Sequence, residues 1–250
     1  MDHQIHVVRC AEAHHNLMGS LPMVDPLLTS FGRLQCASLS QDFPYMNLIT
    51  HIFSSPLRRT ISTSILSFLP ANDCGKEVHL LPELQATGLW DSDRGQTKSQ
   101  LDWEFFLRQD STLIYQGWNT KNETTTSVPH IEARARDARV YLRKIAQKTP
   151  DAHIVVVTHG IMAQFLTQDF GGVGQSGTNF KHAEYRSYQF RHINGQDVEA
   201  ELRETSASRA RRGGTNFWSL NAQDQAALKQ NSIKAIKGWV PGFVEGWTQV

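Results

Sequence analysis

Short apolar runs alternate along the chain with stretches whose apolar residues recur at helical spacing. Four runs have the composition of buried strands, and these are residues 5–8, 48–54, 78–81 and 153–158. Helical spacing predicts helices over residues 29–42, 61–69, 131–148 and 161–169. Because strands and helices alternate in this way, the pattern predicts a parallel sheet whose strands are joined by right-handed crossovers.

Two later segments alternate apolar and polar residues and indicate a hairpin. They are residues 184–192 and 197–202, and Asn194-Gly195 between them is typical of a type I′ turn. Such a hairpin adds an antiparallel strand, which is common in mostly parallel sheets. The predicted fold is therefore an α/β three-layer sandwich, with a mostly parallel sheet, helices on both faces and one antiparallel edge strand.

The chain is expected to form a single domain over residues 1–250, because no repeat or low-complexity linker interrupts it. An aromatic-rich insertion occupies about residues 85–130, with a predicted helix over 99–108 and a polar, exposed loop over 121–127. This insertion either covers the carboxyl edge of the sheet or packs as a helical subdomain away from any ligand. A C-terminal extension occupies about residues 204–250.

The extension is predicted to begin with a basic loop and to continue into an amphipathic helix over 221–237. The arginines of the loop could reach a phosphorylated ligand, although a solvated loop is the simpler interpretation; they are Arg209, Arg211 and Arg212. Three aromatic residues are expected to dock the extension on the body, namely Trp239, Phe243 and Trp247. The many charged residues of the helix over 131–148 are likewise expected to form a solvated face.

The composition is that of an ordinary globular protein, since 40% of the 250 residues are hydrophobic and 20% are charged. A net charge of +1 gives no reason to expect a nucleic-acid or membrane partner. No apolar run approaches the roughly 20 residues that span a bilayer, and the N-terminus lacks the features of a signal peptide. Cys10, Cys36 and Cys74 form neither a metal-binding motif nor a disulfide framework, which favours a reducing, cytoplasmic location.

Polar groups that are costly to bury follow the predicted strands. Arg9 and Cys10 follow the first strand, Arg59 lies just beyond the second, Glu83 follows the third and His159 follows the fourth. Because ligands of such sheets bind at the carboxyl ends of the strands, these side chains are expected to converge. Taken singly, each has a bland structural interpretation. Together, two arginines suit a phosphate or a carboxylate, while His and Glu side chains can move protons.

Five segments, in this order, resemble the motifs of the histidine phosphatase superfamily, whose members share the phosphoglycerate-mutase-like fold. They are Arg9-x-x-Glu12-x-x-x-Asn16, Asp25-x-x-Leu28-Thr29-x-x-Gly32-x-x-Gln35, Ser54-Ser55-Pro56-Leu57-Arg58-Arg59-Thr60, Leu81-Pro82-Glu83-Leu84 and Val156-Val157-Thr158-His159-Gly160. The residues of these motifs are most similar to those of the small-metabolite phosphatase-like proteins common in fungi.

The resemblance implies a role for each residue at the strand ends. Arg9, Arg59 and His159 would form a phosphate pocket, with Asn16 as an additional pocket residue and Glu83 as the proton donor. It implies a hydrolase that needs no cofactor or metal and acts on a small phosphorylated metabolite. Hydrolysis is favoured over mutase activity, which requires a phosphoenzyme shielded from water. Oligomerisation is left open by the sequence.

The chain departs from the family at one position, because Cys10 stands where the family has its nucleophilic histidine. A Cys10 thiolate, favoured by the neighbouring cations, could keep the reaction and form a phosphocysteine. Sulfur lies closer to the backbone than a ring nitrogen does, so the phosphorus would have to move inward.

Other chemistries also fit the position of Cys10. With Glu83 and His159 it could perform acyl hydrolysis, lyase or isomerase chemistry on a carboxylated substrate. The chain could instead be a pseudoenzyme that binds an anion without turnover. A His-to-Cys change engineered to trap a complex would leave the same sequence. A zinc site on Cys10 and His159 has no supporting short-range ligand spacing.

Overall fold

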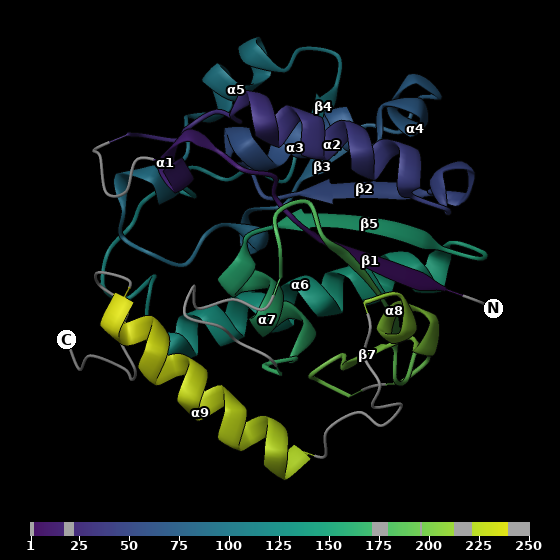
Figure 1. The fold of residues 1–250 in the computed structure, drawn as a ribbon, viewed down its shortest axis with the longest axis vertical. Helices are drawn as coiled ribbons and strands as arrows, with labels where there is room; N and C mark the ends of the chain where they lie inside the picture. Colours follow the sequence, from purple (N-terminus) through teal and green to yellow (C-terminus); the bar gives the residue numbers. More distant parts are fainter. Residues whose placement is uncertain (1–2, 18–22, 172–179, 196, 213–221, 240–250) are drawn as a thin grey trace.

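In the computed structural model, the described residues form one seven-stranded sheet with the strand order β4-β3-β2-β5-β1-β6-β7 (Figure 1). The strands are β1 (Gln4–Arg9), β2 (His51–Ser54), β3 (Val78–Leu80), β4 (Gln109–Asp110), β5 (His153–Thr158), β6 (Tyr185–Phe190) and β7 (Leu202–Glu204). Strands β1 to β5 pair in parallel, whereas β6 and β7 are antiparallel additions beside β1. The structure describes residues 3–17, 23–171, 180–195, 197–212 and 222–239.

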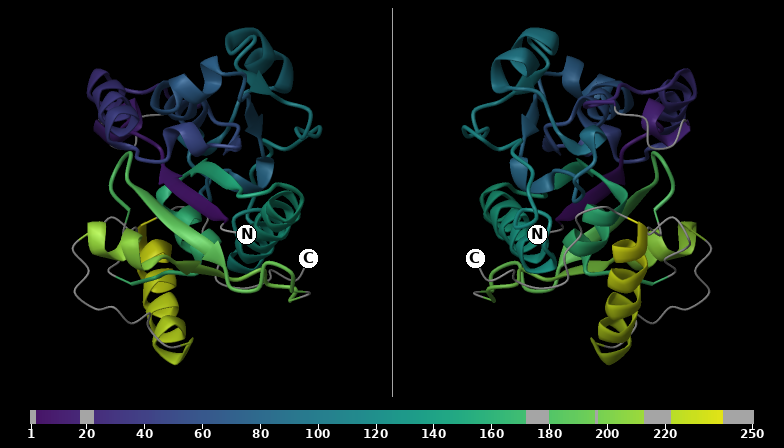
Figure 2. Two further views of the ribbon diagram at one scale, coloured as in Figure 1. Left: turned by 90° about the vertical axis from the view of Figure 1, so that its right-hand side faces the viewer. Right: turned by 90° about the vertical axis from the view of Figure 1, so that its left-hand side faces the viewer.

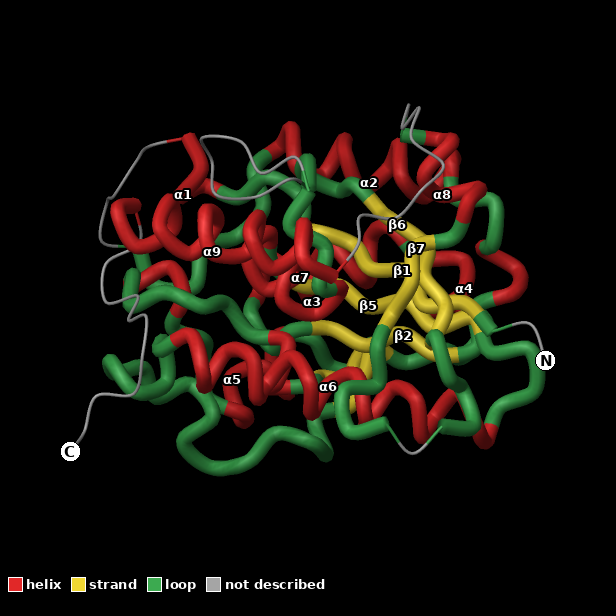
Figure 3. Tube along the Cα trace, turned by 90° about the horizontal axis from the view of Figure 1, so that it is seen from below, coloured by secondary structure: helices red, strands yellow, loops and turns green. Residues whose placement is uncertain are grey.

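Helices cover both faces of this sheet (Figures 2 and 3). The α-helices are α1 (His14–Leu17), α2 (Ser30–Asp42), α3 (Arg58–Ser67), α4 (Leu69–Asp73), α5 (Lys98–Glu104), α6 (Val128–Lys148), α7 (Gly160–Thr167), α8 (Ser206–Arg211) and α9 (Ala222–Trp239). Short 3₁₀-helices in the described segments are η1 (Met46–Leu48), η2 (Pro82–Leu84) and η3 (Asp91–Asp93). The predicted α/β fold, with a mostly parallel sheet between layers of helices, is confirmed.

Strand β5 shows why the sheet has two buried faces. Ile154 and Val156 pack in a cluster with residues of α6 and α7, whereas Val155 and Val157 pack in a second cluster with residues of α2 and α3. Successive side chains of a strand point to opposite faces, so a strand buried on both sides must be apolar throughout. Burial on both faces therefore explains why residues 154–157 are all apolar.

The predicted hairpin turn at Asn194-Gly195 is wrong. Strand β6 ends at Phe190, and β7 begins only at Leu202, which pairs with Phe190 across the ladder. The long connection between them is held against α6, where Arg143 donates to the Asp197 carboxylate at 2.5 Å. The sheet therefore has two antiparallel strands where the sequence predicts one.

The prediction that the charges of α6 form a solvated face is wrong for three arginines, although Lys144 and Lys148 are exposed. Arg134, Arg139 and Arg143 are buried. Arg139 shows the reason, because its guanidinium donates to the carbonyls of Glu199 at 2.7 Å and Phe165 at 3.1 Å. The Phe165 carbonyl lies in the last turn of α7, where carbonyls have no partner within the helix.

The C-terminal extension differs from the prediction in its first part. Arg209 and Arg211 lie in the short helix α8 rather than in a loop, and Arg212 follows it and pairs with Glu204 at 2.7 Å. The predicted amphipathic helix is confirmed as α9, whose Ile233 and Ile236 pack against residues of α6 and α7. Trp239 is the last residue of α9, whereas Phe243 and Trp247 lie outside the described residues.

The insertion contains η3, α5 and β4, and α5 is shorter than the helix predicted over residues 99–108. A capping box of Thr97 and Gln100 begins α5, and Leu107, with φ of 64°, lies beyond its end. Lys121, expected in an exposed loop, is buried. Across the described part of the chain, none of the helices has the length and hydrophobicity needed to cross a bilayer.

The buried position of Arg139 leads to a stability prediction. Replacing it by Ala should lower the free energy of unfolding by about 3 kcal/mol, because hydrogen bonds from a buried charged group to otherwise unpaired carbonyls are lost. Arg136 lies on the same helix but is partly exposed and pairs only with Asp137, so Arg136→Ala should cost less than about 0.5 kcal/mol. Urea unfolding of the two variants measures the difference. Equal losses would show that burial of Arg139 is not stabilising.

Candidate active site

The register of three parallel strands brings Cys10, Ser55 and His159 together. Arg9 of β1 stands opposite Thr158 of β5, and the Cys10 amide donates to the Thr158 carbonyl at 2.8 Å. On the other side of β5, the Ser55 amide donates to the carbonyl of Val157 at 2.9 Å. The three residues therefore follow their strands at neighbouring positions on the carboxyl edge, as the sequence predicts for Cys10 and His159.

Cys10 and His159 are in direct contact. The Sγ atom of Cys10 lies 3.9 Å from Nδ1 of His159, and the Nε2 atom of His159 lies 2.8 Å from Oγ of Ser55. All three side chains are buried. If Nε2 carries the proton and donates it to Ser55, Nδ1 presents a lone pair to the thiol.

Burial lowers the pKa of His159 well below its usual value, and the positive charges of Arg59 and Lys121 lower it further. The imidazole is therefore neutral near pH 7. An arriving anion would offset the neighbouring cations and make protonation of this ring easier. Cys10 and His159 thus form a thiol–imidazole pair whose proton position responds to the charge beside it.

Arg9 lies next to this pair and is held by the loop before β6. Its Nη1 donates to the Phe180 carbonyl at 2.6 Å, and its Nη2 lies 2.8 Å from Nε2 of His182. Burial, followed by the charge of Arg9, lowers the pKa of His182 to about 4, so this ring is neutral and can accept a hydrogen bond. His182 is a neighbour that the sequence reasoning missed.

Arg59 enters from the first turn of α3, with a side chain only 2% exposed. It donates to the Ser92 carbonyl at 2.5 Å and to the Asp93 carboxylate at 3.1 Å, both in or beside η3. Its Nε is buried and has no hydrogen-bond partner among the described residues. The insertion therefore contacts a predicted site residue, which favours its interpretation as a cover for the carboxyl edge.

Two segments of the second motif brace the loop that follows Cys10. The Thr29 hydroxyl donates to the Glu12 carboxylate at 2.7 Å, and the side-chain oxygen of Gln35 accepts from the Glu12 amide at 2.9 Å. A Cβ atom on Gly32 would lie 2.1 Å from the Glu12 carbonyl oxygen, so this approach requires glycine. The motif thus fixes the backbone directly after Cys10.

Two predicted site residues, Glu83 and Asn16, form no hydrogen bond or ion pair with Cys10 or His159 within the described part of the chain. Glu83 is half-buried in η2, where its carboxylate acts on Arg134 and Tyr115: burial and then the charge of Glu83 raise the pKa of Tyr115. Asn16 is exposed on α1. Its Oδ1 accepts from the Ala13 amide at 2.9 Å, and its Nδ2 lies 3.2 Å from Nε2 of His15. In this structure Asn16 therefore orders its own turn.

Lys121 and Arg134 are two cations that the sequence reasoning assigned to solvated segments, whereas both are buried. Their charges contribute to the lowered pKa of His159, which places them near the predicted site. Lys121 donates to the Ala86 carbonyl at 2.7 Å, and Arg134 to the Gln85 carbonyl at 3.1 Å. Only the fold of the insertion shows that they are buried, because their local sequence is polar.

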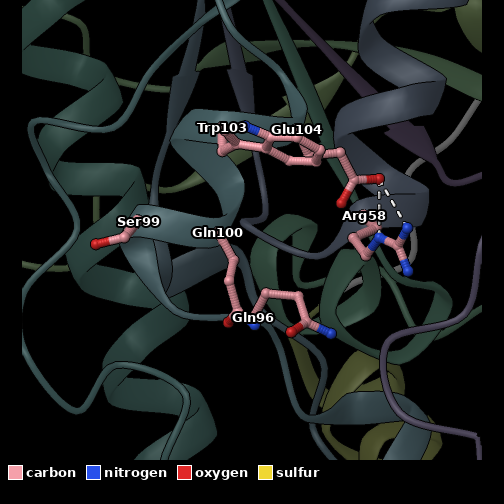
Figure 4. A pocket seen from close by; sticks show the side chains of 6 residues that line it. All are labelled: Arg58, Gln96, Ser99, Gln100, Trp103 and Glu104. Atoms are coloured by element: carbon pink, nitrogen blue, oxygen red, sulfur yellow. Dashed lines mark hydrogen bonds and ion pairs between the residues drawn. The ribbon is translucent and has the colours of Figure 1, made fainter.

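A separate cavity of about 420 Å³ lies beside α5 (Figure 4). It is lined by Arg58, Gln96, Ser99, Gln100, Trp103 and Glu104. None of the predicted site residues lines it. Arg58 forms an exposed ion pair with Glu104 at 2.8 Å there, which separates it from its buried neighbour Arg59.

The gathered side chains are of kinds that can bind an anion and move a proton. Guanidinium groups, neutral imidazoles and a thiol meet at the carboxyl edge of an α/β sheet, where such folds bind their ligands. Among the described residues, no three His, Cys, Asp or Glu side chains are grouped as metal ligands. Fold and site therefore define an α/β protein with guanidinium, imidazole and thiol groups gathered at the carboxyl edge of its sheet.

Comparison of the chain with models of known protein families identifies its family. The model of the histidine phosphatase superfamily (branch 1) matches residues 5–210, and the chain belongs to this superfamily. It is a phosphoric-ester hydrolase-like enzyme by class, as the sequence predicts. A search of curated proteins gave no match.

Solved structures with the same fold include several phosphatases. A mycobacterial glucosyl-3-phosphoglycerate phosphatase complexed with VO3 is 20% identical, with a TM-score of 0.52 over 81% of this chain and 97% of its own. The ecdysone phosphate phosphatase of Bombix mori, complexed with tungstate, is 13% identical, with a TM-score of 0.55 over 75% of this chain and 89% of its own. A protein described as mycobacterial hydrolase 2 is 16% identical, with a TM-score of 0.54 over 92% of this chain and 97% of its own. At these identities the likeness establishes the fold.

Lys121 gives the site a testable pH dependence. Burial, and then the charge of Arg134, lower the pKa of Lys121 from 10.5 to about 7. Below pH 7 the amine is protonated in the folded and the unfolded chain, and the cost of burying its charge is complete. Between pH 7 and pH 10.5 the amine keeps its proton in the unfolded chain but loses it in the folded chain. The unfolded chain therefore binds one proton more, and the free energy of unfolding rises with pH.

Between pH 7 and pH 9, we expect the free energy of unfolding to rise by about 2 kcal/mol more in the wild type than in Lys121→Met. Urea unfolding at the two pH values measures this gain. Lys144→Met, which removes an exposed amine of α6, should show the same rise in the free energy of unfolding as the wild type. A difference between wild type and Lys121→Met that is independent of pH would contradict the assignment.

Proposed function

We propose that the chain is a phosphatase-like hydrolase that acts on a small phosphorylated metabolite, with Cys10 in place of the nucleophilic histidine of its family. The observation that carries the proposal is the grouping of Cys10 and His159 with Arg9 and Arg59. The unpartnered Nε of Arg59 is a buried donor that a phosphate oxygen could accept from. The complexes of the structural neighbours with VO3 and tungstate agree with an oxyanion as the ligand of this fold.

The reaction begins at the contact between Cys10 and His159. The negative charge of the bound phosphoryl group offsets the cations around His159, so Nδ1 can take the thiol proton. The thiolate sulfur attacks phosphorus, and an S–P bond forms while the P–O bond to the leaving group breaks. Arg9 and Arg59 balance the charge on the phosphoryl oxygens, and Glu83 gives a proton to the leaving oxygen.

Hydrolysis of the phosphocysteine completes the cycle. Water attacks phosphorus and gives a proton to the Glu83 carboxylate, the S–P bond breaks, and inorganic phosphate leaves. The sulfur regains its proton from His159. Asn16 is an additional pocket residue in this scheme, and its place on α1 requires it to act from the rim of the site.

A second candidate function follows from the same thiol–imidazole contact. A thiol 3.9 Å from a ring nitrogen is also the arrangement that acyl hydrolysis requires. In that case the arginines would bind the carboxylate of the substrate, and the covalent intermediate would be a thioester. The two functions differ in the group that becomes attached to Cys10.

Phosphate release from a panel of phosphorylated metabolites tests the first proposal. Cys10→Ala should lower kcat by at least about 1,000-fold, because the nucleophile is lost. Cys10→His should retain or increase phosphate release, since the imidazole reaches further toward phosphorus. Cys74→Ala changes an exposed cysteine at the end of α4 and should leave kcat unchanged. If neither the wild type nor Cys10→His releases phosphate, the chain is not a phosphatase.

The covalent intermediate can be trapped independently of steady-state turnover. After rapid acid quenching with substrate, mass spectrometry should find one phosphoryl group on the peptide that contains Cys10 and none in Cys10→Ala. Glu83→Gln should increase the trapped fraction with an activated aryl phosphate, because such a leaving group needs no acid while hydrolysis still needs a base. An acyl adduct on Cys10 would favour the second function instead, and full activity in Cys10→Ala would contradict both.

A further inference from the structure

Lys121 and Arg134 share a single acceptor next to the proposed active site. The Nζ atom of Lys121 donates to the carbonyl oxygen of Ala86 at 2.7 Å, and Nη2 of Arg134 lies 3.4 Å from the same oxygen. Their two charged groups are therefore no more than about 6 Å apart. The fold holds two like charges together in its interior, where they repel each other more strongly than in water.

Carboxylates close enough to form ion pairs do not offset these charges within the described part of the chain. Neither cation has an ion-pair partner there, and their hydrogen bonds go to the backbone carbonyls of Gln85 and Ala86. The Nε of Arg134 is buried without a hydrogen-bond partner. Burial lowers the pKa of Lys121 to about 7 and that of Arg134 to about 10. Both shifts express the cost of burying a positive charge, which the nearby Glu83 and Asp93 offset only in part.

The position of the pair connects it to the site. Gln85 and Ala86 follow directly on η2, which carries Glu83. Both cations contribute to the lowered pKa of His159, and Arg59 contributes to that of Lys121. The pair therefore lies beside the phosphoryl pocket, on the side from which Glu83 would reach the leaving group.

A purely structural role does not account for both cations. One neutral donor would satisfy the Ala86 carbonyl without the cost of burying a charge. The acidic side chains in the neighbourhood, Glu83 and Asp93, reduce but do not neutralise the field, since Asp93 already pairs with Arg59. A singly charged ligand group with two oxygen acceptors fits an amine and a guanidinium set this far apart.

We propose that Lys121 and Arg134 form a second anion subsite, which binds a carboxylate on the leaving-group portion of a phosphoester substrate. The inference rests on the proposed function, because it takes the phosphoryl group to lie at Cys10, Arg9 and Arg59. It assigns the substrate class as phosphorylated carboxylic acids rather than phosphorylated alcohols or sugars without a second charge.

Two ligands that differ only at the relevant group test this subsite. 3-Phosphoglycerate and glycerol 3-phosphate share a three-carbon skeleton and a phosphate, but only the first carries a carboxylate. Isothermal titration should show that the wild type binds 3-phosphoglycerate at least about tenfold more tightly. Lys121→Met should reduce this preference to about threefold or less, whereas Lys144→Met, which removes an exposed charge of α6, should keep it.

A wild type without preference for the carboxylate, or a preference that Lys121→Met leaves intact, would overturn the subsite. Equal weakening of both ligands by Lys121→Met would show a structural brace and would overturn it too. Phosphate release is measured on the same samples: binding preference without release contradicts the phosphatase proposal alone, and release without preference contradicts the subsite alone.

Discussion

The register between β1 and β5 is the constraint on which the rest of the site depends. With Arg9 opposite Thr158, the next residues along the two strands, Cys10 and His159, must emerge side by side. The pairing of Ser54 with Val157 adds Ser55 on the far side of the histidine. A shift of one residue would turn the apolar side chains of β5 to the wrong faces, so packing of the two clusters protects the geometry of the site.

The second property of the site is its excess of positive charge in a buried setting. Arg9, Arg59, Lys121 and Arg134 surround imidazoles whose pKa values are lowered, first by burial and then by these cations. Neutral histidines avoid further repulsion and can serve as donors or acceptors. An anion that enters such a site relieves repulsion among several groups at once. Binding of a charged substrate and the protonation state of His159 are therefore coupled.

The sequence predicted those parts of the molecule that local patterns determine. The apolar run of β5 and the polar residues directly after it were enough to predict that Cys10 and His159 meet. The burial of Lys121 and Arg134 was not predictable, because it depends on where the insertion and α6 pack against the backbone of Gln85 and Ala86. The prediction of a hairpin turn at Asn194-Gly195 was wrong for a similar reason. The segment between β6 and β7 contacts Arg139 and Arg143 of α6 instead of forming a tight hairpin. How Cys10 takes part in the reaction remains a proposal that rests on the family resemblance and on its contact with His159.

In the proposed mechanism, Cys10 holds the position from which phosphorus is attacked. The most direct test is a crystal structure of the protein grown with orthovanadate, which adopts the geometry of phosphoryl transfer. We expect vanadium at bonding distance from Cys10 Sγ, with its oxygens accepting hydrogen bonds from Arg9 and Arg59. Vanadate bound at this edge but away from the sulfur, or absent from the site, would contradict it.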